Sequence, residues 1–103
     1  MSVIVDFSIF PVDKGDSVGL YVAKAVKIIR ESGLDYRIGP MGTCIEGEWE
    51  DVIGVVNRCF EKMKEESSRI YMTLKVDYRQ GQNGRIAGKV KSLEDKLGHF
   101  NKL

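Results

Sequence analysis

Two long segments of the chain alternate apolar and polar residues. In the segment 2–10 the apolar side chains that share one side are Val3, Val5, Phe7 and Ile9. In the segment 69–77 the corresponding set is Ile70, Met72, Leu74 and Val76. A period of two residues is that of a β-strand with one buried face, so both segments are predicted to be strands of a sheet.

Three other segments carry apolar residues at helical spacing. The first is expected to begin at a cap, Asp16 or Ser17, and to stop at Gly33. The second follows the acidic Glu48, and the third follows the polar loop 79–84. Their apolar positions are Val18, Val22, Ala25 and Ile29; Val52, Val56, Cys59 and Met63; and Ile86, Val90, Leu93 and Leu97. Recurrence every three or four residues predicts three amphipathic helices.

Between the first two helices lie two short strands joined by a turn. Residues 35–38 and 43–48 flank Gly39-Pro40-Met41-Gly42, which is typical of a hairpin turn. The complete order is strand, helix, strand, strand, helix, strand and a closing helix. This order predicts an α+β, ferredoxin-like sandwich, βαββαβ plus a C-terminal helix, with a four-stranded antiparallel sheet. A length of 103 residues with 43% hydrophobic content suits a single domain, 1–103.

In such a fold both helices cover one face of the sheet, and the other face remains open. The alternation assigns to this open face Ile4, Asp6, Ser8, Phe10, Tyr71, Thr73, Lys75 and Asp77. The alternatives are a solvated face and a face covered by another molecule. Because two aromatic rings and an isoleucine turned to water would form a large apolar patch, we expect copies of the chain to associate through their sheets as a dimer or tetramer.

Charge and cysteine content narrow the choice of partner. Sixteen basic residues against 15 acidic ones give no strong field for nucleic acid. No apolar run approaches the length of a membrane span, and the N-terminal segment 1–10 has no basic residues before its apolar run, which predicts a cytoplasmic protein. Cys44 and Cys59 lack a CxxC spacing and are expected to be reduced, packed thiols. With His99 as the one histidine, the sequence offers no histidine-rich metal site, and no cofactor is predicted.

The densest local pattern that could hold a ligand is the hairpin and the strand after it. Glycines beside Pro40 allow close approach to the backbone, and Thr43 and Glu46 add a hydroxyl and a carboxylate. Residue types alone favour an ordinary hairpin turn. For Asp77 and Arg79, a salt bridge at the end of a strand is the better interpretation than a functional site. For Tyr36 and Trp49, packing is the better interpretation than contact with a ligand.

No nucleophile has an adjacent base, and no paired acids or phosphate loop occur, so nothing in the sequence supports an enzyme. A small enzyme of this fold would need a carboxylate or cysteine with a strongly perturbed pKa in a cleft. A structural or regulatory homo-oligomer without a ligand is the other alternative.

Taken together, several of these runs resemble the small thiamine-binding protein family of the YkoF-like superfamily. The resemblance rests on Tyr21-Val22-Ala23, Ser32-Gly33-Leu34-Asp35-Tyr36, Gly39-Pro40-Met41-Gly42-Thr43 with Ile45-Glu46-Gly47-Glu48, and Lys75-Val76-Asp77 with Arg79. It covers nearly the whole chain, and the hairpin run is its specific part.

The resemblance implies homo-oligomers built by sheet-to-sheet pairing, often tetramers, and binding of thiamine or its hydroxymethylpyrimidine part without turnover. It suggests a role in storage, delivery or sensing of the vitamin. An aminopyrimidine needs a flat apolar contact with donors and acceptors, and a thiazolium cation favours carboxylate and aromatic faces. The expected ligand-binding residues are Asp6, Ser8, Tyr36, Met41, Gly42, Thr43 and Glu46.

Overall fold

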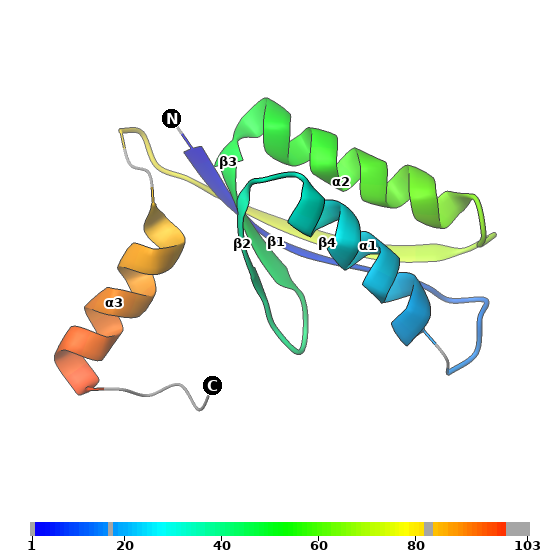
Figure 1. Cartoon of the computed structure of the whole chain (residues 1–103), viewed down its shortest axis with the longest axis horizontal. Coiled ribbons are helices and arrows are strands. Elements are labelled where there is room, and N and C mark those ends of the chain that lie inside the picture. Colours follow the sequence, from blue (N-terminus) through cyan, green and yellow to red (C-terminus); the bar gives the residue numbers. More distant parts are fainter. Residues whose placement is uncertain (1, 17, 82–83, 99–103) are drawn as a thin grey trace.

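The computed structural model describes residues 2–16, 18–81 and 84–98. Its elements, in chain order, are β1 (Ser2–Pro11), α1 (Gly19–Glu31), β2 (Asp35–Ile38), β3 (Thr43–Glu48), α2 (Trp49–Lys64), β4 (Ile70–Tyr78) and α3 (Arg85–Leu97) (Figure 1). The strands form one antiparallel sheet in the order β2-β3-β1-β4. The predicted ferredoxin-like architecture is confirmed. His99 lies outside the described residues.

The core lies between the sheet and the layer formed by α1 and α2. It consists of the alternate residues of β1, the inward residues of the two helices, and Ile45 of β3; its buried members are Val3, Val5, Phe7, Ile9, Ala25, Ile29, Ile45, Val52, Val55, Val56, Cys59 and Met63. Burial of these apolar side chains is the main stabilising contribution to such a domain.

The first helix differs from the prediction at its start. Its N-cap is Val18, which makes no side-chain capping bond, so Asp16 is not the cap, and Ser17 lies outside the described residues. Its end agrees with the prediction. Gly33 adopts φ of 78°, a conformation that favours glycine and ends the helix.

The helix side of the fourth strand is less buried than predicted. Met72 and Val76 lie on the same face as the core residues Ile9 and Val5, to which they are paired, yet they are 41% and 45% exposed. The reason is that α1 packs over β1 and β2, α2 packs over β1 and β3, and β4 lies at the other edge of the sheet, beyond both helices.

The third helix leaves the sheet instead of covering it. Figure 1 shows α3 starting at the end of the sheet and running away from the other elements. Leu93 and Leu97, on its apolar side, are exposed. No helix among the described residues has the length and apolar character required to cross a membrane.

Candidate functional site

A cavity of about 290 Å³ opens between α1, the β2–β3 hairpin and the far half of β1. Three segments line it: residues 7–10 of β1, residues 38–43 of the hairpin, and from α1 and its cap Val18, Val22, Ala25, Val26 and Ile29. The helix therefore supplies an aliphatic wall, and the hairpin supplies the opposite wall.

The cavity exists because two strand ladders end at different places. Pairing of β1 with β3 stops at Phe7 and Thr43, whereas pairing with β4 continues to Pro11. Beyond Phe7 the hairpin bends away from β1 (Figure 1). The edge of β1 along residues 8–10 then faces the cavity, and main-chain groups on an edge without a ladder are available to a ligand.

Gly42 stands where the hairpin leaves β1. A Cβ atom at this position would lie 3.0 Å from the carbonyl oxygen of Phe7 and 3.3 Å from Oδ1 of Asp6. The turn is closed by the N–H of Gly39, which donates to the carbonyl oxygen of Gly42 at 2.8 Å. These contacts explain why glycine suits this position and place the Asp6 carboxylate beside the cavity wall.

The lining is almost entirely apolar. Among the described residues that form it, none has an ionisable side chain, and the polar side chains are the hydroxyls of Ser8 and Thr43. Thr43 is buried and Met41 is highly exposed at the mouth. Such a lining accepts a flat apolar ring and orients it through a few hydroxyl and main-chain groups.

Of the seven predicted ligand residues, four line this cavity: Ser8, Met41, Gly42 and Thr43. The other three lie elsewhere. Asp6 is exposed, with its carboxylate near Gly42 at the edge of the site. Tyr36 is half-buried and packs against the hydrophobic core.

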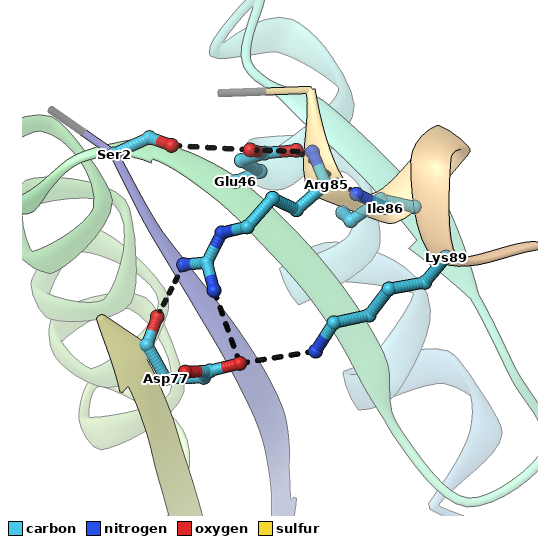
Figure 2. A network of polar contacts seen from close by, with 6 residues as sticks. All are labelled: Ser2, Glu46, Asp77, Arg85, Ile86 and Lys89. Atoms are coloured by element: carbon cyan, nitrogen blue, oxygen red, sulfur yellow. Dashed lines mark hydrogen bonds and ion pairs between the residues drawn. The ribbon is translucent and has the colours of Figure 1, made fainter. Parts of the chain in front are cut away.

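Glu46 lies in a separate polar network on the open face of the sheet (Figure 2). It is only 5% exposed. Its carboxylate accepts the main-chain N–H of Arg85 at 3.0 Å, the main-chain N–H of Ile86 at 3.2 Å and the hydroxyl of Ser2 at 3.1 Å. Glu46 therefore provides the hydrogen-bond acceptor for free N–H groups in the first turn of α3. The N-cap of this helix, Gly84, has no side chain that could do so.

Arg85 fixes the same turn from the other side. Its buried guanidinium donates to the main-chain oxygen of Asp77 at 2.7 Å and forms an ion pair with the Asp77 carboxylate at 3.1 Å. Lys89, one turn further along α3, also reaches that carboxylate at 3.0 Å. Asp77 is thus paired with two residues of α3, Arg85 and Lys89.

The charges in this network set its titration. Burial opposes ionisation of Glu46, but the N–H groups of Arg85 and Ile86, the Ser2 hydroxyl and the Arg85 charge outweigh it and hold the pKa of Glu46 below its ordinary value. The bond from Lys89 and the neighbouring Arg85 lower the pKa of Asp77. Both carboxylates are ionised at neutral pH.

The role of Arg85 was missed by the sequence interpretation. The available signal was a glycine-rich loop followed by a helix without a capping side chain, which requires an acceptor from elsewhere in the fold. The sequence could not name that acceptor because it lies 39 residues away.

The two cysteines are free, as predicted. Cys59 is buried in α2, with its thiol 3.6 Å from the carbonyl oxygen of Ala25, and burial raises its pKa to about 11. Cys44 is half-buried, and burial together with Asp6 raises its pKa. Within residues 2–16, 18–81 and 84–98, no cluster of three or more His, Cys, Asp or Glu residues could hold a metal ion.

Comparison with known proteins identifies the family to which this chain is similar. Residues 5–94 match the family described as thiamine-binding protein. A UPF0045 protein from Mycobacterium bovis is 38% identical over 95 residues, which are 91% of this chain and 93% of that protein.

Solved structures match the fold over nearly the whole chain. A hypothetical protein from Methanocaldococcus jannaschii superposes with a TM-score of 0.84 at 28% identity and covers 91% of this chain and 97% of its own. A Thermotoga maritima protein, described as one of thiamine biosynthesis or salvage, superposes with a TM-score of 0.81 at 25% identity and covers 90% of this chain and 99% of its own.

Proposed function

Because the chain belongs to the thiamine-binding protein family, we propose that its hairpin cavity binds thiamine or its hydroxymethylpyrimidine part without chemical turnover. The observation that carries the proposal is the meeting of Ser8, Met41, Gly42 and Thr43 around one cavity. The protein would serve storage, delivery or sensing of the vitamin. The thiamine-related description of the Thermotoga maritima neighbour supports the same ligand class.

Cavity size supports a small ligand. A volume of about 290 Å³ stands at the lower end of the range of about 300–1,000 Å³ for ligand sites. One substituted ring, with part of a second, suits this space better than a dinucleotide or another large cofactor.

The lining favours the pyrimidine over the thiazolium. An unpaired cation among aliphatic side chains would lose its hydration without compensation, whereas a neutral aminopyrimidine needs only a few hydrogen-bonding groups. We therefore place the pyrimidine in the cavity, against Val22 and Ile29, with its polar groups toward the Thr43 hydroxyl and the β1 edge. The thiazolium would stay at the mouth, where the Asp6 carboxylate lies beside Gly42.

The same lining supports binding without catalysis. Two hydroxyls, from Ser8 and Thr43, are the polar side chains of the described lining, and neither has an adjacent base there. General acid–base or nucleophilic catalysis requires such a neighbour.

Calorimetric titration with hydroxymethylpyrimidine and with thiamine tests the proposal. A ligand of the folded state also raises the unfolding temperature with the logarithm of its concentration. Val22→Phe, at the cavity wall, should weaken binding at least tenfold by occupying the space. Val12→Phe, an exposed site outside the lining, is the matched control. Absence of binding by both compounds would refute the proposal.

We also propose that copies associate through the open face of the sheet. Phe10 and Tyr71 stack there with ring centroids 5.6 Å apart, and both remain exposed. If neither compound binds while a stable oligomer is found, the structural or regulatory oligomer becomes the better assignment.

A further inference from the structure

One residue of β1 has main-chain groups on the cavity side that no strand pairs. The ladder between β1 and β3 ends at Phe7, and within the described part of the chain no strand residue stands opposite Ile9 on that side. Ile9 is only 6% exposed and lines the cavity. Main-chain groups without a partner are unfavourable in a buried, apolar position, and nearly all buried ones in proteins are bonded. The cavity side of Ile9 is therefore a place where a ligand gains by supplying the partner.

Two contacts fix the side to which these groups point. In an antiparallel strand the N–H and C=O of one residue point to the same neighbour, and successive residues alternate between the two neighbours. Just after β1, the N–H of Val12 donates to the carbonyl oxygen of Arg69 at 2.8 Å, so the even-numbered residues of β1 bond to β4. The carbonyl oxygen of Phe7 lies on the other side, beside Gly42. Ile9 follows Phe7 by two residues in an unbroken register, so both its N–H and its C=O point toward the hairpin and the cavity.

We propose that the main-chain N–H and C=O of Ile9 determine the specificity of this cavity, and that they select an aminopyrimidine over a pyrimidine in which a carbonyl replaces the amino group. The ring nitrogen beside the amino group accepts the N–H of Ile9, and the amino group donates to the C=O of the same residue. The ligand is that of the proposed function, on which this assignment rests.

A pair of bonds to one residue distinguishes the order of donor and acceptor. Ile9 offers one donor and one acceptor side by side, as it would to an antiparallel strand. An aminopyrimidine presents the complementary acceptor and donor on one edge. The oxo analogue presents a ring N–H and a carbonyl oxygen there, so donor would meet donor and acceptor would meet acceptor. Turning the ring over would restore the two bonds only by moving its methyl and hydroxymethyl groups to new positions against the walls.

The side chains of the cavity do not make this distinction. The polar side chains of the described lining are the hydroxyls of Ser8 and Thr43. A hydroxyl both donates and accepts, and it rotates to suit its partner, so it accommodates an amino group and a carbonyl equally. The N–H and C=O of Ile9 have fixed roles. Selection between the two kinds of ring therefore depends on the main chain.

Amide hydrogen exchange followed by NMR, without and with hydroxymethylpyrimidine, tests the proposed donor. The Ile9 amide should exchange at least about tenfold more slowly at saturating pyrimidine than in the free protein, because its N–H is then bonded. The amides of Ser8 and Phe10, which bond to β4, are the matched controls and should be slow in both states. An Ile9 amide that exchanges at the same rate in both states would overturn the assignment.

Calorimetric titration with hydroxymethylpyrimidine and with its oxo analogue tests the selection. The oxo analogue should bind at least about tenfold more weakly, because each group of Ile9 then loses its partner. Thr43→Val has a similar shape and lacks the hydroxyl. It should weaken both compounds by a similar factor and leave the ratio of their affinities within about twofold of the wild-type ratio, as independent contributions add. Loss of the ratio in this variant would assign the selection to the hydroxyl and overturn the role of Ile9.

The outcomes separate this assignment from the proposed function. If hydroxymethylpyrimidine and thiamine both fail to bind, both are refuted. If the pyrimidine binds while the exchange of Ile9 is unchanged, or while the oxo analogue binds equally well, the cavity keeps its ligand and Ile9 does not determine its specificity.

Discussion

The carboxylate of Glu46 in β3 accepts the main-chain N–H of Arg85 at 3.0 Å, although 39 residues separate them in the sequence. This bond attaches the first turn of α3 to the sheet. Since the rest of α3 runs away from the sheet (Figure 1), the orientation of the helix depends on the polar contacts of that turn (Figure 2).

Glu46→Ala should destabilise the fold without affecting the ligand. The substitution removes the acceptor of three hydrogen bonds from a buried site. The main-chain N–H groups of Arg85 and Ile86 then lose the carboxylate to which they donate. We expect a loss of about 1–3 kcal/mol in the free energy of unfolding, measured by urea denaturation, and faster amide exchange in the first turn of α3.

Ligand affinity distinguishes the structural role of Glu46 at α3 from the ligand-binding role predicted from the sequence. A carboxylate that binds thiamine would lose affinity in Glu46→Gln, with little change in stability. The network instead predicts unchanged affinity for thiamine and its pyrimidine, because Glu46 lies outside the described cavity lining. A tenfold loss of affinity in a folded Glu46→Gln protein would restore Glu46 to the ligand site.

Acid should weaken the attachment of α3. The pKa of Glu46 is lowered in the folded state from an ordinary value of 4.5. Its ionised form therefore adds stability that is fully present above about pH 4.5 and is lost as the pH falls through the folded-state pKa. Other acidic groups also titrate in this range, so the informative quantity is the difference between wild type and Glu46→Gln. That difference should be constant from pH 7 to 5 and should shrink below pH 4.5; a difference independent of pH down to 3 would contradict the assignment.

Gly42→Ala should damage the hairpin that forms one wall of the cavity. The added methyl group would meet the carbonyl oxygen of Phe7 at 3.0 Å, and backbone must shift to relieve it. We expect a loss of about 1–3 kcal/mol in unfolding free energy and weaker ligand binding. Gly54→Ala in α2 is the control, because its added methyl group meets nothing within 4 Å and alanine favours a helix by roughly 1 kcal/mol. Equal effects of the two substitutions would exclude the contact with Phe7 as the cause.

The cysteines should behave as packing residues. With a pKa of about 11, Cys59 is a neutral thiol at pH 8 and should react with a thiol reagent only upon unfolding. Cys59→Ala should cost about 1 kcal/mol in stability and leave ligand affinity within twofold. Rapid reaction of Cys59 with the thiol reagent in the native protein would contradict this expectation, because it would show that the buried thiol becomes accessible without unfolding.

A charge on the open face should disrupt association through that face. Phe10→Lys separates the stacked pair with Tyr71 and places a cation in the apolar patch. The oligomeric mass should fall while the circular dichroism spectrum stays that of wild type; ligand affinity is not the control here, because Phe10 also lines the cavity. Lys75→Gln, on the same face of the sheet, is the control that keeps the patch. An unchanged mass for Phe10→Lys would exclude Phe10 from any interface.

Short-range patterns in the sequence were sufficient for the elements and their order. Alternation in residues 2–10 and the glycines around Pro40 act over a few bonds, so strand, turn and helix could be assigned from neighbours alone, and the order of elements then allowed few topologies. Met41, Gly42 and Thr43 could be grouped as candidates for the same reason: they are adjacent in the chain, share one turn and line one cavity.

Tertiary structure decided which distant residues meet. The cavity depends on the β1–β3 ladder ending at Phe7 while the β1–β4 ladder continues, a difference that no local pattern encodes. The residue type of Glu46 and its place beside the hairpin suggested a ligand-binding role. The path of the chain instead brings the start of α3, which lacks a capping side chain, against the Glu46 carboxylate. Met72 and Val76 alternate as buried residues should, yet the helices pack over β1, β2 and β3 and leave these two side chains of β4 exposed. Periodicity determines the face to which a side chain points, whereas burial and bonding depend on what the rest of the chain places against that face.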